Sequence, residues 1–170
     1  MPQVRLCFFE GARGLLEGRE PLCVPPLRLW LRGVLRVWWQ QGRHLPSPGE
    51  LALMDRVGIP LPGLRRRAFP WGADRWLADG QELPEMPGWR LLHTPGHTRD
   101  SICLLGPEGT LLSGDTILNM RGRGELNRFC CDREELERSF GRLRRHAVRR
   151  LLPGHGRPLE AEGLLEDVLR

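Results

Sequence analysis

The sequence predicts a single α/β domain, spanning residues 1–170. A chain of this length can bury one hydrophobic core and is too short for two ordinary domains. Its 40% apolar and 28% charged residues are typical of globular proteins rather than disordered chains. Short extended segments bounded by Gly or Pro fill the middle of the sequence, and strand and helix patterns alternate after them. This alternation predicts the α/β class.

Residues 1–70 are rich in arginine and tryptophan, and their pattern predicts helices. From Leu27 to Trp39 apolar side chains recur at helical spacing, with a basic face beside them. A second helix is predicted from Ser47, which starts a capping-box pattern, to about Gly58. A basic, Trp-rich helix would suit a membrane surface or a partner's groove. The preferred interpretation is a helix that covers the core of its own domain or a substrate cleft.

Residues 71–117 are predicted to form short strands. Within DRWLADGQEL (residues 74–83), Asp79-Gly80 is a turn between two extended pieces. The segments GWRLLHTPG, SICLL and GTLLSGD follow, each bounded by Gly or Pro. The last two are joined by Gly106-Pro107-Glu108-Gly109, which predicts a hairpin.

The rest of the chain returns to helices and strands. Asp132 is a suitable N-cap, and the helix that it starts is expected to run to about His146. Three apolar positions should face the core from this helix: Leu136, Phe140 and Leu143. The segment VRRLLPGHG (residues 148–156) predicts a strand that enters a loop, and residues 160–170 predict a closing helix.

The cysteines and the chain start indicate the cellular setting. Cysteines occur at positions 7, 23, 103, 130 and 131, an odd number without CxxC spacing. This argues against a disulfide framework or a cysteine-only zinc site, so small buried side chains are expected. No apolar run approaches the ~20 residues that span a bilayer. The first residues lack the pattern of a secretory leader, and a cytoplasmic protein is therefore expected.

The net charge of +5 says little about function. All 26 basic residues are arginines, which bind phosphates and carboxylates well. They are spread along the whole chain, however, and a solvated basic surface is favoured over a nucleic-acid site.

A potential metal ligand follows three of the predicted strands. His97 lies in TPGHT, Asp115 in LLSGDT and His155 in LLPGHG, each directly after a glycine. Sites in α/β proteins gather at strand ends, where loops converge. One histidine in such a place is more often structural, but the threefold pattern of strand, glycine and ligand favours a site. Two imidazoles and a carboxylate suit Zn²⁺, with Fe or Mn as alternatives.

These segments resemble motifs of the metallo-β-lactamase superfamily. HTPGHTRDSICLL, LLSGDT and LLPGHG are similar to its third, fourth and fifth metal-binding motifs, in the same order. The resemblance covers residues 71–170 and implies an αββα sandwich with a dinuclear site, usually zinc, between its sheets. It implies that His97 binds the first metal, Asp115 bridges both and His155 binds the second. It also implies a hydrolase in which metal-bound hydroxide attacks an ester, thioester, lactam or similar bond in a small-molecule substrate.

The family's principal motif, HxHxDH, is absent from the sequence. His44 is the only histidine before His93, and it has no acidic or histidine neighbour. Residues 4–21 resemble the strand and helix that follow HxHxDH, so the sandwich is expected to be N-terminally incomplete. The apolar surface left exposed would favour a homo-oligomer or aggregation. A non-catalytic remnant or binding module of the same fold is therefore the alternative to a hydrolase.

His93 is interpreted as a strand-end residue and not as a ligand. It lies four positions before His97, the spacing of the two zinc-binding histidines on a metalloprotease helix. Pro95 and Gly96 between them exclude that helix. In the resembling family, the earlier histidine is generally not a ligand.

Overall fold

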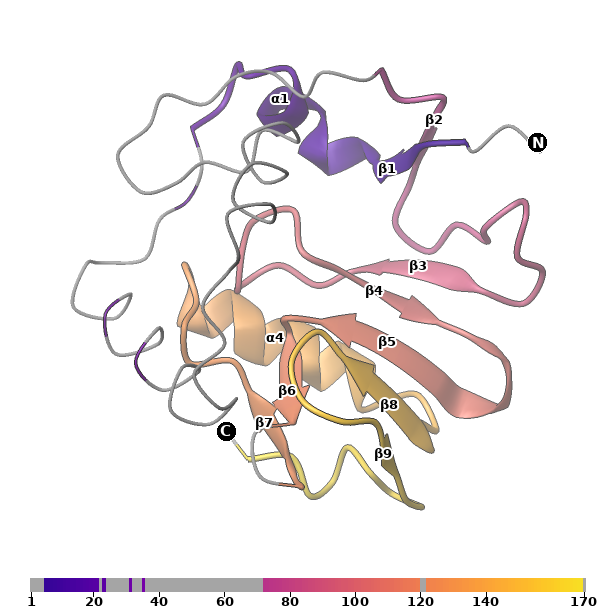
Figure 1. The fold of residues 1–170 in the computed structure, drawn as a ribbon, viewed down its shortest axis with the longest axis vertical. Coiled ribbons are helices and arrows are strands. Elements are labelled where there is room, and N and C mark those ends of the chain that lie inside the picture. The colour runs from indigo at the N-terminus through magenta and orange to yellow at the C-terminus, as the bar shows by residue number, and fades with distance from the viewer. Residues whose placement is uncertain are drawn as a thin grey trace, which may run out of the picture.

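The computed structural model describes residues 5–21, 23, 31, 35, 72–119 and 122–169. At its centre lies a five-stranded sheet with the strand order β3-β4-β5-β8-β9 (Figure 1). These strands are β3 (Arg90–His93), β4 (Ile102–Leu105), β5 (Thr110–Gly114), β8 (Arg150–Pro153) and β9 (Leu159–Glu160). The short helix η2 (Pro107–Gly109) makes the turn of the predicted hairpin between β4 and β5.

Strand direction in this sheet decides where the loops meet. β3 is antiparallel to β4, and β4 is antiparallel to β5. β5 pairs in parallel with β8, with Leu111 opposite Leu151 and Gly114 opposite Pro153. The strands β3, β5 and β8 therefore run in the same direction, and their carboxyl ends lie at one edge of the sheet. The three segments that follow these strands carry His97, Asp115 and His155.

Helix α4 (Arg133–Leu143) covers one face of the sheet (Figure 1). Asp132 is its N-cap, as predicted, because a side-chain oxygen of Asp132 accepts a hydrogen bond from the Glu135 N–H at 2.9 Å. The predicted inward positions Leu136, Phe140 and Leu143 are all buried. They form the main core with apolar side chains of the strands, including Cys103, Leu111 and Leu151.

The opposite face of the sheet packs on the N-terminal strands. β1 (Cys7–Phe9) pairs in parallel with β2 (Arg75–Leu77), and Phe9 and Leu77 form a second core with Leu91 of β3. The short helices η1 (Glu10–Ala12) and α1 (Arg13–Leu16) follow β1, so the start of the chain has the predicted strand-then-helix order. A small antiparallel pair, β6 (Ile117–Asn119) and β7 (Gly124–Leu126), closes the main core beside α4.

The predicted closing helix over residues 160–170 is wrong for the described residues of that range. Residues 159–160 are β9, and turns follow it, with Gly163 at φ +64°. The Leu169 N–H donates to the Gly124 carbonyl, and the Leu126 N–H donates to the Leu169 carbonyl. The backbone groups of Leu169 are therefore used to pair with β7. Leu164, Leu165 and Val168 still bury their side chains in the main core.

The prediction that the cysteines are all unpaired is also wrong. Cys23 and Cys131 form a disulfide, with their Cα atoms 6.1 Å apart. Because 108 positions separate them in the sequence, spacing alone could not reveal the pair. Cys103 and Cys130 are buried free thiols, as expected, whereas Cys7 is exposed.

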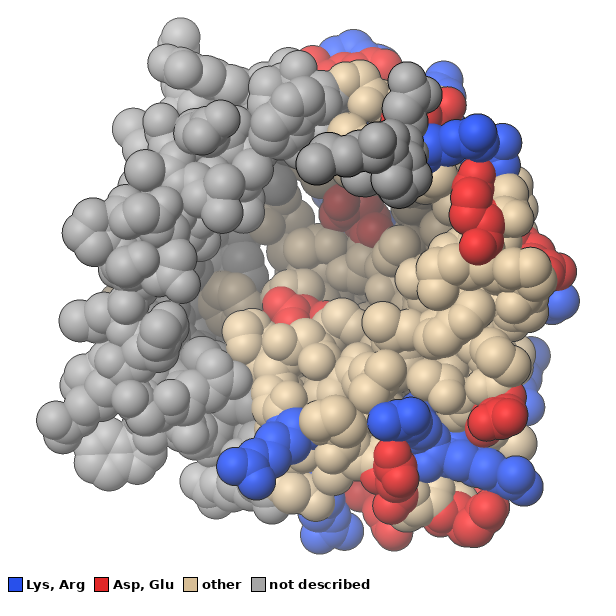
Figure 2. Space-filling model, turned by 45° about the vertical axis from the view of Figure 1, so that its right-hand side comes forward, with Lys and Arg blue, Asp and Glu red and all other residues tan. Residues whose placement is uncertain are grey.

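The two helices predicted within residues 27–58 lie outside the described residues, apart from Leu31 and Leu35. Both of these leucines are exposed, with 48% and 60% of their surface accessible. Within the described ranges, no helix has the length and apolar character needed to cross a bilayer. On the described part of the face in Figure 2, arginine and acidic side chains are interspersed along the right-hand and lower margins.

Removing Leu111 should destabilise the fold strongly, because this side chain is completely buried at the centre of the sheet. We expect Leu111→Ala to lower the free energy of unfolding by about 2–5 kcal/mol, measured by urea denaturation. Met86→Ala is the control, since Met86 is 42% exposed and should lose less than about 0.5 kcal/mol. Equal losses for the two variants would contradict this assignment of the core.

Candidate metal centre

The three predicted ligand residues come together at the carboxyl edge of the sheet. Nε2 of His97 lies 3.7 Å from Oδ2 of Asp115, and Nε2 of His155 lies 3.6 Å from Oδ1 of the same carboxylate. Asp115 is thus between the two imidazoles, with a different oxygen toward each. The side chain of His97 is 17% exposed, whereas those of Asp115 and His155 are 35% and 39% exposed. The group is therefore accessible from solvent.

A tight turn at the end of β5 presents Asp115. The Thr116 N–H donates to the Ser113 carbonyl at 3.0 Å, and the buried Ser113 hydroxyl donates to the Ile117 carbonyl at 2.7 Å. Gly114 has φ +49°, a left-handed conformation that favours glycine at this position. The Gly154 N–H donates to the Gly114 carbonyl at 2.8 Å, which ties the loop after β8 to this turn. This bond holds Asp115 and His155 in adjacent loops.

The imidazole of His97 is held by the segment before α4. Its Nδ1 lies 2.6 Å from the Phe129 carbonyl oxygen. Because a carbonyl can only accept, this separation requires the proton on Nδ1 of His97. The Asn127 side-chain nitrogen, 3.1 Å from the same Nδ1, is then a packing neighbour, and Asn127 Oδ1 accepts from the Phe129 N–H. The lone pair of His97 is left on Nε2, the atom that faces Asp115.

Asn119 holds the loop that carries His155. Its backbone N–H donates to the His155 carbonyl at 3.0 Å, and its side-chain Nδ2 donates to the Arg157 carbonyl at 2.7 Å. Gly156 lies between these two anchors at φ +97°, and a Cβ there would overlap the Asn119 backbone. The close approach therefore requires glycine at position 156.

The separations within this group fit ligands of a metal better than a hydrogen-bonded pair. The N···O distances of 3.6 and 3.7 Å exceed the length of an N–H···O hydrogen bond. If His97 is neutral, its Nε2 lone pair faces a carboxylate oxygen, and a metal cation between the two would make this arrangement favourable. Two tetrahedral zinc ligands, each about 2.0–2.2 Å from the ion, lie about 3.4 Å apart. Each His–Asp pair is therefore close to the spacing for one shared metal.

No three His, Cys, Asp or Glu side chains among the described residues converge on one point that could hold a metal. The arrangement instead consists of two half-sites, His97 with Asp115 and His155 with Asp115. Two protein ligands do not complete a tetrahedral zinc site. The described residues thus supply two ligands to each half of a dinuclear centre.

His93 lies outside this group. Its ring stacks on Phe9, with centroids 4.5 Å apart, and its Nε2 lies 2.8 Å from the Arg99 carbonyl. The Arg142 guanidinium donates to the His93 carbonyl at 2.7 Å. Through these contacts His93, at the end of β3, connects β1, α4 and the loop that follows β3. This agrees with its interpretation as a strand-end residue.

Cys103 lies in the main core beside a pair of buried threonines and is not a candidate ligand. Its Sγ is 3.3 Å from the Thr94 hydroxyl, which in turn lies 3.2 Å from the Thr116 hydroxyl. Complete burial raises the pKa of the Cys103 thiol to about 11, against a smaller opposing effect of the threonine hydrogen bonds. Because thiolate is the form that binds metal, this thiol stays protonated and inert near neutral pH.

Sequence reasoning missed the residues that orient the ligands. Asn119, Asn127 and the Phe129 carbonyl act on His155 and His97 from 30 or more positions away along the chain. A single sequence carries no periodicity or motif that marks such contacts. The asparagines at the end of β6 and after β7 are the only local hint, since asparagine is uncommon within strands.

Comparison with known proteins supplies the family. The model of the metallo-beta-lactamase superfamily matches residues 28–155, which is most of the chain. The chain belongs to the metallo-beta-lactamase superfamily. The predicted family and fold class are therefore confirmed. Members of this superfamily usually bind metal ions and share a metal-dependent hydrolase fold.

Individual relatives match parts of this superfamily chain. The "Beta-lactamase-like protein 2 homolog" of Drosophila melanogaster is 40% identical over 85 residues, which are 49% of this chain and 27% of the fly protein. The chain thus spans about a quarter of that relative. The structure of TTHA1623 in a di-iron-bound form has 23% identity and a TM-score of 0.51, covering 96% of this chain and 62% of that one. The structure of the metallo-beta-lactamase family protein TTHA1429 from Thermus thermophilus has 24% identity and a TM-score of 0.48. That match covers 92% of this chain and 53% of TTHA1429.

Gly154→Ala should disturb Asp115 directly. A Cβ at position 154 would overlap Asp115 Oδ1 and would lie 3.1 Å from the Gly114 carbonyl group. We expect a loss of about 1–3 kcal/mol in unfolding free energy, measured by urea denaturation. Gly141→Ala is the matched control, because nothing lies within 4 Å of a Cβ on that helix position and alanine should add about 0.5–1 kcal/mol. A neutral Gly154→Ala would contradict the tight contact.

Cys103 should resist alkylation in the folded protein. At pH 8, well below its raised pKa of about 11, almost no thiolate is present, and the side chain is completely buried. Iodoacetamide should therefore modify the exposed Cys7 and spare Cys103 until urea unfolds the chain, as peptide mass spectrometry would show. Modification of both at similar rates in the native protein would disprove this account of Cys103.

Proposed function

We propose that this chain carries part of the dinuclear metal centre of a metal-dependent hydrolase. In this proposal, His97 binds one metal, His155 binds the other, and Asp115 lies between them as a shared ligand. The observation that carries the proposal is the position of the Asp115 carboxylate, with Oδ2 toward His97 and Oδ1 toward His155.

Zinc is the proposed metal. Imidazole nitrogen with carboxylate oxygen suits Zn²⁺, and the same donors also accept iron and manganese. The structurally similar TTHA1623 is known in a di-iron-bound form, so iron is the first alternative to test. Metals of this kind, when bound, supply a Lewis acid and an activated water for attack on an ester, thioester, lactam or similar bond.

The residues of this chain would orient and hold that centre. The Phe129 carbonyl keeps the proton of His97 on Nδ1, which leaves Nε2 free to act as a ligand. The bond from the Gly154 N–H to the Gly114 carbonyl fixes the loop of His155 against the turn of Asp115. Exposure of about a third of the Asp115 and His155 side chains gives a small-molecule substrate access to the centre.

The 170 residues by themselves should bind metal weakly and turn over little substrate. Three ligands divided between two metal positions leave each position undersupplied, and the sequence has no HxHxDH to add the others. Tight, near-stoichiometric zinc together with hydrolysis of a generic ester would refute this part of the proposal. The alternative, a non-catalytic binding module, predicts that alanine at all three positions leaves the biological activity of the protein intact.

Zinc binding by single variants tests the shared-ligand arrangement. We expect His97→Ala and His155→Ala each to abolish one class of Zn²⁺ sites, and Asp115→Ala to weaken both by about tenfold or more, as measured by isothermal titration. His146→Ala is the matched control, because it removes a histidine that follows α4 and lies outside the site. If Asp115→Ala binds zinc as the unmodified chain does, or if His146→Ala loses as much, the ligand assignment is wrong.

A further inference from the structure

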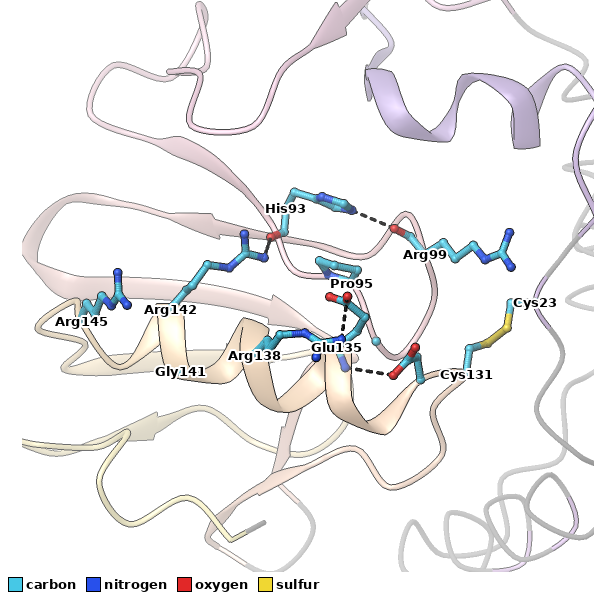
Figure 3. A pocket seen from close by; sticks show the side chains of 12 residues that line it. Cys23, His93, Pro95, Arg99, Cys131, Glu135, Arg138, Gly141, Arg142 and Arg145 are labelled. Carbon is cyan, nitrogen blue, oxygen red and sulfur yellow. Dashed lines mark hydrogen bonds and ion pairs between the residues drawn. A yellow bond between two sulfur atoms is a disulfide. The ribbon is translucent and has the colours of Figure 1, made fainter.

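A second feature of chemical interest is a cavity of about 930 Å³ between α4 and the loop after β3. Figure 3 shows the Cys23–Cys131 disulfide at the end of the cavity where α4 begins, with Arg138 and Arg142 farther along the helix and Arg145 in the turn that follows it. Arg99 projects from the loop on the opposite wall. Both half-cystines line the cavity and are only partly buried, which places the disulfide at the cavity wall.

The charge of the cavity lining is positive. The lining contains four arginine side chains and two carboxylates, those of Asp132 and Glu135. Asp132 keeps its negative charge while it caps α4, and Glu135 accepts from Arg138 at 2.8 Å, so the lining carries two more positive than negative side chains. Of the four arginines, Arg138 forms ion pairs with Glu134 and Glu135, whereas no ion pair between described residues involves Arg99 or Arg145. An anion that enters this space therefore meets guanidinium groups whose charge is not neutralised locally.

We propose that the Cys23–Cys131 disulfide is a thiol-exchange site for small anionic thiols. A thiolate RS⁻ attacks one sulfur of the disulfide, the S–S bond breaks, and the other cysteine leaves as a thiolate. A second RS⁻ then attacks the mixed disulfide and releases RSSR. The two reagent thiols are oxidised, the disulfide is reduced, and the protein thiolates take up protons from water. Because the arginines attract anions, a thiol that carries an additional negative group should react faster at this disulfide than a thiol that carries a positive group.

This exchange acts on the segment that holds His97. The Cys131 N–H lies 2.9 Å from the Gly96 carbonyl and 3.1 Å from the His97 carbonyl, and the Asp132 N–H donates to the Gly96 carbonyl at 2.9 Å. The same segment supplies the Phe129 carbonyl to the His97 ring. Reduction breaks the covalent link between Cys131 and Cys23, and the segment of residues 129–132 is then held less firmly. An effect of this change on metal binding would rest on the proposed function, but the exchange itself does not.

Reduction rates with thiols of different charge test the exchange site. The oxidised chain is treated with 2-mercaptoethanesulfonate, neutral 2-mercaptoethanol or cationic 2-mercaptoethylamine, and alkylation with mass spectrometry follows the release of Cys23 and Cys131. Rates are expressed per thiolate. We expect the sulfonate to react about threefold or more faster than the amine at low ionic strength, with the ratio falling toward one at high salt.

Two matched variants test whether this preference comes from the cavity. Arg99→Gln should reduce the ratio of the two rates. Arg144→Gln changes an exposed arginine that directly follows α4 and does not line the cavity, and it should leave the ratio unchanged. A ratio near one at low salt, or equal ratios in Arg99→Gln and the unmodified chain, overturns the proposal. So does alkylation of both Cys23 and Cys131 in the air-oxidised protein without any reductant.

Amide hydrogen exchange tests the link to His97 without metal. In the metal-free chain, the amides of Cys131 and Asp132 should exchange several-fold faster after reduction. Cys23→Ser should show the same increase with no reductant, while Cys7→Ser should not. Unchanged exchange in both the reduced chain and Cys23→Ser contradicts the link. These results do not depend on metal binding, so failure here and failure of the metal-centre proposal can be told apart.

Discussion

The parallel pairing of β5 with β8 places two of the three candidate ligands in neighbouring loops. Without it, Asp115 and His155, 40 positions apart in the sequence, would not share one edge of the sheet. The pairing ends in the hydrogen bond from the Gly154 N–H to the Gly114 carbonyl, and at this point a Cβ on residue 154 would reach the Asp115 carboxylate. The packing of backbone against backbone therefore sets the position of the shared carboxylate.

Much of the fold could be predicted because its signals are local. Apolar runs bounded by Gly or Pro coincide with the strands at residues 90–93, 102–105, 110–114 and 150–153. Asp132 caps α4 through the hydrogen bond that its side chain accepts from a backbone N–H of the first turn. The three residues of the candidate centre could be proposed because strand, glycine and ligand recur in the same pattern. Their convergence follows from strand direction, which a single sequence does not show but the family resemblance supplied.

The failures of prediction have a common physical origin in long-range contacts. Residues 160–170 have helix-forming composition, but Leu169 pairs with β7, which is close only in the folded chain. Cys23 and Cys131 are brought together over 108 positions. The contact between His97 and Phe129 likewise forms only when the segment before α4 meets the loop after β3. Each of these features depends on a neighbour that no local pattern encodes.

In the proposed centre, His97 and His155 offer their Nε2 atoms to metals on either side of Asp115. Long-range ¹H–¹⁵N NMR correlations of the histidine rings during a Zn²⁺ titration would reveal this binding. We expect His97 to carry its proton on Nδ1 before zinc is added. Zinc should then shift the Nε2 resonances of His97 and His155 and leave those of His93 and His146 in place. A proton on Nε2 of metal-free His97, or zinc shifts confined to the other histidines, would contradict it.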